Sequence, residues 1–390
     1  PLARAIFPTM TEPLPRAEEL RDRLGDDTLW SALVDRPLGE LLRTSLGSDL
    51  ARGIALTDGL IGTFSHSDDE TLSQNRCFLY HVIGGGTGDW DVPVGGMGHV
   101  TAELERAARD AGADIRTNTE VTAISPDGEV SIAGGASIAG RLVLSAVGPA
   151  VLAGLLAVGG AADTDEGDQP EGAQVKVNML LRRLPRLRDA GVAPAAAFAG
   201  TFHVNESLSQ LDRSFAAAAG GSIPDPLPAE IYCHSLTDPS ILGPELRSSG
   251  AQSLTLFGLQ LPHRLVRERD RDAARSELLR AAQASLDSVL AEPIADCVYE
   301  APDGTPCIEA MTTADLESSL GMVGGDIFHG ALSWPWADGD ETLATASARW
   351  GVSTEYERVL LCGSGARRGG AVSALGGHNA AMAALELLGV

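Results

Sequence analysis

Two glycine clusters in this chain could bring the backbone close to a flat or phosphate-bearing ligand. The first, "VGGMG", contains Gly95, Gly96 and Gly98 and precedes a helix-like stretch. The second, "CGSGARRGG", contains Gly363 and Gly365 and follows strand-like "VLL". Glycine permits close backbone approach, and the free N–H groups at a helix start favour an anion. An ordinary structural turn has the same appearance, so each cluster alone leaves both interpretations open.

The first cluster has an unusual order of elements. Residues 92–121, "VPVGGMGHVTAELERAARDAGADIRTNTEV", run from glycine to helix to strand, whereas a nucleotide fingerprint runs from strand to glycine to helix. No G-x-G-x-x-G occurs in the sequence, because "GGGTGD" ends at Asp89 and "GSGARR" ends at Arg368. The segment therefore predicts a return into a dinucleotide domain whose fingerprint lies elsewhere. The helix is expected to pack through one apolar face, made by Val100, Leu104, Ala108 and Ala111.

Histidine and arginine side chains lie next to these motifs. His99, His329 and His378 could move protons near neutral pH, but structural hydrogen bonding is the favoured interpretation, and no catalytic residue is assigned. Arg367 and Arg368 are expected to be solvated surface charges. The alternative is that they neutralise cofactor phosphates or a substrate carboxylate. The sequence has no G-x-S-x-G elbow, which argues against a serine hydrolase.

Composition excludes several other classes of function. Among 390 residues, 53 are acidic and 29 basic, giving a net charge of −24 that disfavours nucleic acid and anionic lipid surfaces as partners. Lys176 is the sole lysine, so a P-loop is excluded. Five cysteines without a C-x-x-C pair predict no metal site and indicate a reducing, cytoplasmic setting. The apolar run from Leu142 is broken by Gly148 and Pro149, which favours a strand, a turn and a short helix over a membrane span.

The pattern of elements predicts a mixed α/β protein. Residues 1–81 have helical spacing and form a helical cap, and residues 82–158 form a first segment of a cofactor domain. An acidic loop, 159–174, leads to a substrate domain, 175–310, with strand-like "QVKVNMLL", "EIYCHSL" and "SLTLFGLQ" before a long amphipathic helix. Residues 311–390 return to the cofactor domain and end in strand, glycine loop and helix.

Four segments together resemble one family: "FLYHVIGGGTGDWDVPVGGMG", "AGADIRTNTEV", "ADLESSLGMVGGDIFHG" and "LLCGSGARRGGAVSALGGHNAA". They are similar to phytoene-desaturase-like FAD-dependent oxidoreductases, and most similar to the branch of pyridine nucleotide-disulfide oxidoreductase domain-containing protein 2. The resemblance covers essentially the whole chain. It implies a flavoprotein of amine-oxidase and phytoene-desaturase architecture whose FAD contacts are Gly95, Gly96, Met97, Val121, Gly363, Ser364, Gly365, Gly370, Ala371, Val372 and Ser373.

The resemblance also implies an activity, which is dehydrogenation or isomerisation of an apolar small molecule such as an isoprenoid or lipid. The substrate pocket is expected to be mainly apolar and to lie between the strands at 175–181 and 253–261 and the N-terminal helices. The two glycine turns are expected to converge on one cleft. At the tail, Ala371 and the Arg367–Arg368 pair depart from the family pattern G-T-H-P-G-G-G-V, which leaves the substrate class open.

The family's N-terminal βαβ unit, which carries the phosphate fingerprint, has no counterpart in this sequence. The expectation is an incomplete flavoenzyme that binds FAD weakly alone and needs a complementary flavin-domain chain or dimerisation to cover an exposed sheet edge. Two alternatives stay open: a non-catalytic binding protein derived from a flavoenzyme, and one half of a natural split flavoenzyme.

Overall fold

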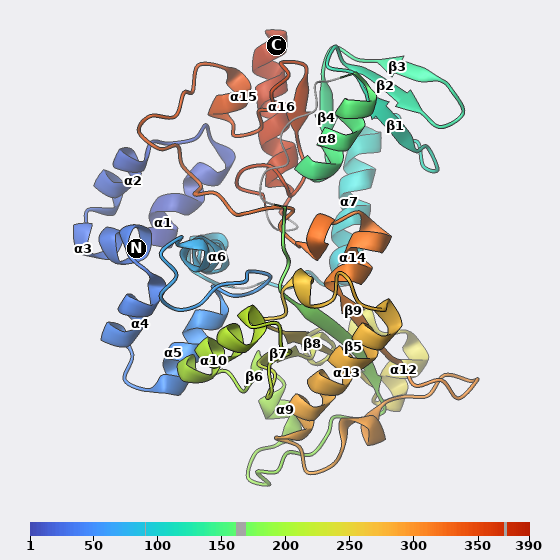
Figure 1. Ribbon diagram of the computed structural model, residues 1–390. Helices are drawn as coiled ribbons and strands as arrows, with labels where there is room; N and C mark the ends of the chain where they lie inside the picture. Colours follow the sequence, from blue (N-terminus) through green and yellow to red (C-terminus); the bar gives the residue numbers. More distant parts are fainter. Residues whose placement is uncertain (90, 161–168, 370–372) are drawn as a thin grey trace.

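The computed structural model of the chain describes residues 1–89, 91–160, 169–369 and 373–390. Figure 1 shows the N-terminal helices along one side, an antiparallel sheet with α13 (Arg271–Asp287) in the lower part, and α16 (Leu375–Leu388) with several short strands in the upper part. The mixed α/β fold predicted from the sequence is confirmed.

Short helices form the N-terminal part, as the apolar spacing predicts. They are α1 (Leu2–Ile6), α2 (Ala17–Leu24), α3 (Asp27–Trp30), α4 (Leu38–Ser45), α5 (Asp49–Thr57) and α6 (Ser73–Val82), with tighter or wider turns at η1 (Phe7–Thr11), η2 (Ser31–Asp35) and η3 (Gly84–Gly86). Gly25 ends α2 in the left-handed conformation, as its position predicts. Gly47 is not the cap of α4, because Leu46 ends that helix in extended conformation.

A five-stranded antiparallel sheet forms the lower part of the molecule. Its order is β6 (Phe202–Val204), β7 (Ala229–Tyr232), β8 (Gln252–Gly258), β5 (Val175–Leu181) and β9 (Ile308–Thr312). Along β5, Val175, Val177 and Met179 are buried while Lys176 is exposed, so the strand has one apolar and one polar face. The apolar face packs against α13 in the largest core of the protein.

Shorter elements surround this sheet. The helices are α9 (Pro194–Ala197), α10 (Leu208–Ala219), α11 (His234–Thr237), α12 (Pro244–Ser249) and α14 (Thr313–Leu320), with single turns at η4 (Pro239–Ile241), η5 (His263–Leu265), η6 (Ile294–Cys297) and η7 (Val323–Gly325). A second core lies on the other face of the sheet, where Phe257 and Leu259 meet leucines of α4, α5 and α10. The N-terminal helices therefore cover part of the sheet's polar face.

The upper part is built on two strands that are far apart in sequence. β4 (Val143–Ser145) pairs in parallel with β10 (Val359–Leu361), and each strand leads through a glycine-containing loop to a helix, α8 (Pro149–Val158) or α16. The run from Leu142 is thus a strand, a turn and a helix, as predicted. Beside it lie the meander of β1 (Val121–Ile124), β2 (Glu129–Ile132) and β3 (Ser137–Ala139), and the helices α7 (Met97–Asp110) and α15 (Ala346–Arg349). None of the described helices combines the length and the apolar character that crossing a bilayer requires.

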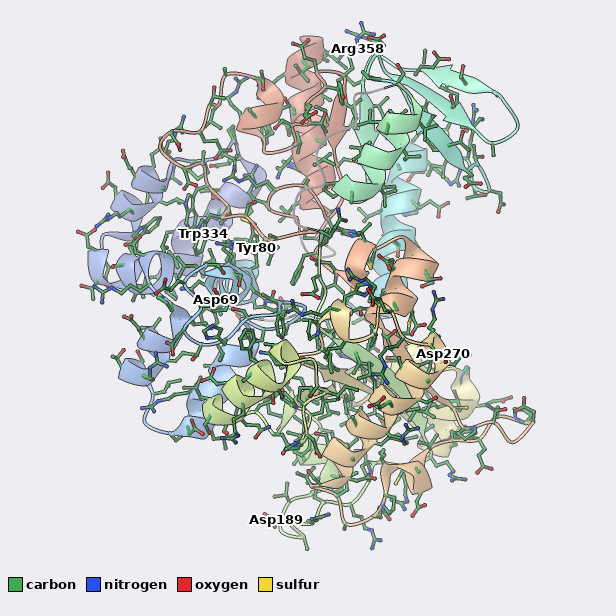
Figure 2. All side chains as sticks on the ribbon, viewed as in Figure 1. Asp69, Tyr80, Asp189, Asp270, Trp334 and Arg358 are labelled. Atoms are coloured by element: carbon green, nitrogen blue, oxygen red, sulfur yellow. The ribbon has the colours of Figure 1, made fainter. Side chains whose placement is uncertain are left out.

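Aromatic side chains join the N-terminal helices to the C-terminal part. The Tyr80 hydroxyl donates to the Ser333 carbonyl at 2.9 Å, and the Arg76 guanidinium lies 5.8 Å from the ring centre of Trp334 (Figure 2). Trp334 stacks on Trp336, which is 1% exposed. These contacts hold the helical cap against the return segment.

The apolar face of α7 is uncovered, and the prediction that it packs inward is wrong for this chain. None of the residues of α7 is buried, and Leu104 is 51% exposed. The helix still forms because its surface carries ion pairs such as Arg106 with Asp110 and Arg109 with Glu105. Its amphipathic pattern is real, but no described element lies over the apolar stripe.

The exposure of α7 gives a direct stability prediction. Leu104→Ala should change the free energy of unfolding by less than about 0.5 kcal/mol, because the side chain is already half in water. Leu278→Ala, at a position of α13 that is 1% exposed, should cost about 3 kcal/mol. Urea unfolding followed by circular dichroism measures both. Equal losses in the two variants would show that α7 is covered in solution.

Candidate functional site

The carboxyl ends of β4 and β10 bring two glycine-containing loops together. A Cβ atom added at Gly363 would lie 2.2 Å from the Ala146 carbonyl oxygen, and one at Gly365 would lie 2.5 Å from the Pro149 ring. Glycine is therefore required here because the two loops pass in backbone contact. In open α/β sheets, ligands bind outside the carboxyl ends of parallel strands. Gly363, Ser364 and Gly365 thus lie at a suitable edge for a cofactor.

The rest of the C-terminal glycine loop is only partly described. Gly370, Ala371 and Val372 lie outside the described residues. Ser373 is exposed, and its hydroxyl accepts a weak hydrogen bond from the Leu375 N–H at 3.4 Å. The backbone at Ala374 is left-handed immediately before α16 begins.

The first glycine cluster lies against a different part of the chain. The Gly95 N–H donates to Asp238 Oδ2 at 2.7 Å, and the face of Gly96 that would carry a side chain is directed at Ile241. Met97 is 45% exposed at the start of α7, and Val121 is 37% exposed on β1. This turn contacts the α11–η4 segment, whereas Gly363 and Gly365 contact the β4–α8 turn. Convergence of the two turns on one cleft stays a prediction.

A cavity of about 510 Å³ lies where the N-terminal part meets the sheet domain and the return segment. Its lining is Gly62, Thr63, Phe64, Ser73, Gln169, Pro170, Glu171, Arg264, Asp326, Phe328, Gly330, Ala331 and Leu332. The Arg264 guanidinium lies 4.6 Å from the ring centre of Phe64 and pairs with Glu171 at 3.3 Å. The lining combines apolar side chains with one arginine and two carboxylates. Its lining contains no residue of 175–181 or 253–261, so this cavity does not lie where the sequence predicts the pocket, and its charged groups distinguish it from the expected mainly apolar lining. The apolar substrate stays a prediction.

Asp326 is the buried carboxyl group of this cavity. Burial raises its pKa to about 6, against the opposing effect of backbone N–H groups of Phe328, Gly330 and His329. Its Oδ1 accepts from the Phe328 N–H at 2.8 Å. The group is therefore ionised at neutral pH but takes up a proton in mildly acidic solution.

The three histidines singled out from the sequence occupy different surroundings. His99 is exposed. His329 lies beside Gly148 and Gly365 in left-handed conformation, and burial lowers its pKa, so its imidazole is neutral at pH 7. His378 meets the edge of the Trp350 ring. None of these contacts is specific to a catalyst, and no catalytic residue is assigned.

Both tail arginines are structural, and their interpretation as solvated charges is wrong. Arg368 is 1% exposed and donates to the carbonyl oxygens of Thr9, Glu12 and Trp350 at 2.6–2.9 Å. Arg367 donates to the Trp334 carbonyl at 3.0 Å and pairs with Glu341. The planar guanidinium with its several donors explains why arginine stands at both positions. Arg368 joins the glycine loop to the N-terminal segment at Thr9 and Glu12, and Arg367 joins it to the return segment at Trp334 and Glu341.

The sequence analysis missed a buried polar cluster on the sheet. His203 on β6 and Glu230 on β7 are cross-strand partners, and His203 Nδ1 lies 2.5 Å from Glu206 Oε2. Burial raises the pKa of Glu206 to about 8. Burial is the largest single effect on His203 and lowers its pKa, but the hydrogen bond to Glu206 and the nearby acidic charges together outweigh burial, so the pKa is raised. The only sequence signal was charge at strand positions, "FHVNE" and "AEIY".

The residues at the ends of β4 and β10 fit part of FAD. Two loops in close backbone contact, the partly exposed Ser364 and the start of α16 form a surface that a cofactor can approach. A glycine turn in G-x-G-x-x-G spacing, which would hold the pyrophosphate, is absent from the sequence. The loops after β4 and β10 would therefore hold one side of the cofactor, and this placement stays a prediction.

Comparison with known proteins agrees with this assignment. The family model described as flavin containing amine oxidoreductase matches residues 3–177. An uncharacterized protein of Mycobacterium bovis is 53% identical over 98% of this chain and 72% of its own length. Rat pyridine nucleotide-disulfide oxidoreductase domain-containing protein 2 is 27% identical over 90% of this chain and 60% of its own length.

The match over residues 3–177 and the shared fold support a flavin amine-oxidase-type family for this chain. A solved putrescine oxidase, redesigned in its cofactor binding, has the same fold, with a TM-score of 0.50 and 14% identity over 93% of this chain and 70% of that one. The match to this family model and the shared fold support FAD as the cofactor. The expected resemblance is thereby confirmed at the level of flavin-dependent oxidoreductases.

The role of Arg368 can be tested by its removal. Arg368→Leu removes hydrogen bonds to three carbonyl groups, two of them in buried contacts and one in a partly buried contact, and we expect a loss of about 3 kcal/mol in the free energy of unfolding. Arg358→Leu is the control, since that side chain is exposed and, within the part of the chain that the structure describes, donates a single hydrogen bond, to the Asp127 carbonyl (Figure 2). Its loss should be about 0.5 kcal/mol. If urea unfolding gives the same value for both variants, Arg368 does not hold the loop.

The raised pKa of Asp326 predicts that the free energy of unfolding depends on pH. Its pKa is raised in the folded protein, so between about pH 4 and pH 6 the unfolded chain binds fewer protons and stability falls as pH rises. Asp326→Asn removes this effect and keeps a carbonyl acceptor. The wild-type stability relative to Asp326→Asn should decrease by up to about 3 kcal/mol from pH 4 to pH 7. Urea titrations of both proteins at each pH measure the difference, and a constant difference would contradict the prediction.

Proposed function

We propose that this chain provides the substrate domain and the C-terminal flavin-binding edge of an FAD-dependent oxidoreductase that acts as a dehydrogenase or isomerase. The observation that carries this function is the parallel pairing of β4 and β10, whose carboxyl ends both run into glycine-containing loops followed by helices. When bound, FAD supplies a hydride acceptor. The task of the protein is to hold the substrate carbon beside it.

The cavity beside Phe64 indicates the kind of substrate. Phe64, Phe328 and Leu332 give the lining an apolar part, and Arg264, paired with Glu171, gives it a charged part. An apolar small molecule with one polar or anionic end, such as a functionalised isoprenoid or lipid, would place its body on the aromatic side chains and its polar end near Arg264. Sites of this kind use apolar walls with few polar groups that fix orientation.

No strong protein base is required for this chemistry. Hydride removal from carbon depends on position and on exclusion of water more than on a catalytic side chain. The buried Asp326 and the neutral His329 lie on the turn that forms one wall of the cavity and hold its shape through backbone contacts. Their part in this function is to position the wall.

The uncovered face of α7 supports the proposal that a further segment of the cofactor domain packs on this helix. Leu104 and Met97 on α7, and Val121 on β1, are exposed although their pattern is that of a packed face. In the complete enzyme, an α/β segment with the phosphate fingerprint covers this face, either from the same polypeptide or from a partner chain. The mycobacterial relative, of which this chain matches 72%, has additional length. All five cysteines are unpaired, which fits a reducing compartment such as the cytoplasm.

Flavin titration tests this function. FAD added to the chain alone should bind with a dissociation constant above about 1 μM, because the fingerprint that holds the pyrophosphate is absent. Quenching of flavin fluorescence measures it. Ser364→Asp, which places a negative charge at the loop after β10, should weaken binding at least about tenfold. Ser353→Asp is the matched control, since Ser353 is an exposed serine of the same domain, and it should leave the affinity unchanged.

Three results would contradict the assignment. Sub-micromolar binding by the chain alone would show that no additional segment is needed. Equal affinity of the Ser364→Asp and Ser353→Asp variants for FAD would show that the flavin does not bind at the loop after β10. Absence of any saturable binding would show that this chain provides no flavin contacts of its own.

A further inference from the structure

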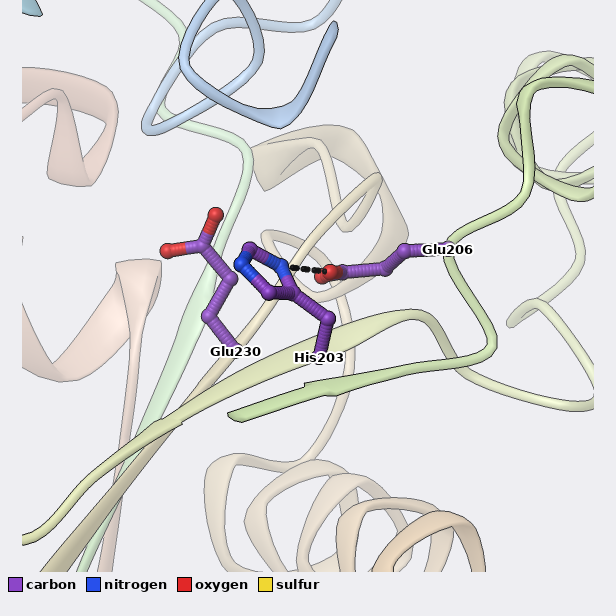
Figure 3. Close-up of side chains that lie close together, drawn as sticks. All are labelled: His203, Glu206 and Glu230. Carbon is purple, nitrogen blue, oxygen red and sulfur yellow. Dashed lines mark hydrogen bonds and ion pairs between the residues drawn. The ribbon is translucent and has the colours of Figure 1, made fainter. Parts of the chain in front are cut away.

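A histidine and two glutamates converge on the polar face of the large sheet, where the N-terminal helices cover it. His203 and Glu230 face each other across β6 and β7, and Glu206 follows β6 by two residues. Figure 3 shows the imidazole of His203 between the two carboxylates, with one ring nitrogen toward each. One ligand atom from each of the three side chains can be chosen so that all lie within 4.8 Å of one another.

The position of Glu206 is fixed by its neighbours on both sides. Asn205 adopts the left-handed conformation, and its amide donates to Ser285 Oγ at 2.9 Å. On the opposite side, a Cβ atom at Gly53 of α5 would lie 1.9 Å from the Glu206 carbonyl oxygen. The backbone of α5 therefore packs directly on this residue. A loop held in this way presents its carboxylate with little freedom, as a preorganised ligand set requires.

One oxygen of this carboxylate has no partner. The Glu206 side chain is fully buried, its Oε2 lies against His203, and its Oε1 makes no hydrogen bond. Buried carboxylate oxygens are normally satisfied, because their desolvation is costly. Glu230 is also buried, and Asp58 at the end of α5 adds a third acidic group near the other two. Three acidic groups thus surround a single imidazole, and one buried carboxylate oxygen among them has no donor.

We propose that His203, Glu206 and Glu230 bind one divalent transition-metal ion. An imidazole with two carboxylates is a nitrogen and oxygen donor set suited to Zn²⁺ or Mn²⁺. The two carboxylates balance the charge of the ion, and the unpartnered Oε1 of Glu206 becomes a ligand atom. The Tyr232 hydroxyl hydrogen-bonds to Glu230 and orients this carboxylate from outside the ligand set, as supporting residues of metal sites do.

The ion would join three pieces of the chain. It links β6, β7 and the loop at Glu206 directly beneath α5, at the boundary between the sheet and the helical cap. A metal there stabilises the cap on the sheet and does not depend on bound flavin. Its presence is therefore independent of the proposed oxidoreductase function.

Metal titration of the whole chain tests this site. After treatment with a chelator and its removal, Zn²⁺ or Mn²⁺ is added and followed by isothermal calorimetry, with the thermal midpoint measured in parallel. We expect one equivalent to bind and the midpoint to rise, because an ion that binds only the folded state stabilises it. Electron paramagnetic resonance of Mn²⁺ gives a spectroscopic readout of the bound ion. Mg²⁺ and Ca²⁺ should bind more weakly.

Variants locate the ion. Glu206→Gln and Glu230→Gln should each weaken the affinity at least about tenfold and remove the rise in thermal midpoint. Both substitutions are close in shape and remove buried charge, so the variants should fold, which circular dichroism verifies. Asp315→Asn is the control, because Asp315 is a buried carboxylate that pairs with Arg275 outside this cluster. It should bind metal as the wild type does.

Two results would overturn the metal site. One is the absence of saturable binding in the chelator-treated wild type. The other is unchanged affinity in Glu206→Gln and Glu230→Gln, which would assign any bound metal to other histidines of the chain.

Discussion

The pairing of β5 with β8 on one side and β9 on the other fixes the arrangement of the lower half of the molecule. All seven residues of β5 have a partner on β8, and five have a partner on β9. Since side chains alternate along a strand, this register places Val175, Val177 and Met179 against α13 and Lys176 on the opposite face. A slip of one residue would bury the lysine in the apolar core. The strict alternation of β5 therefore determines which face of the sheet is available for polar groups.

The polar face is therefore buried at one end and exposed to solvent at the other. Successive cross-strand partners form one row, which is His203, Glu230, Phe257, Lys176 and Met311. The end with His203 and Glu230 is covered by the helical cap, while Lys176 reaches solvent. A sheet that is half covered by helices can thus hold buried ionisable groups at one end and an open surface at the other. The same cap also forms part of the wall of the cavity that contains Phe64 and Arg264.

Local patterns were sufficient for the regular elements but not for the site. The alternation in β5 and the apolar spacing of α13 predicted both elements, because each pattern reports one buried face. β6 has three residues and was missed, since so short a strand has no detectable period. The cluster at His203 depends on the register between β6 and β7, which a single sequence does not contain. Arg368 was misread because its partners are carbonyl groups more than 350 positions away in the chain or in a neighbouring loop.

The prediction that α7 packs through its apolar face was wrong for a different reason. Its pattern correctly identified an amphipathic helix, but a pattern gives only the face that should be covered and not the element that covers it. Leu104 therefore combines a residue type typical of a core with half exposure.

The parallel pair of β4 and β10 has a consequence for the order in which the chain folds. The sheet domain lies entirely between these two strands, so their pairing closes a loop of roughly 200 residues, and contacts of such long range form slowly because the entropy of loop closure opposes them. Collapse of the intervening sheet onto α13 brings the two strands within reach. The edge formed by β4 and β10, where we propose that flavin binds, is then among the last parts to assemble during refolding. A newly made chain must complete its sheet before it can acquire a cofactor.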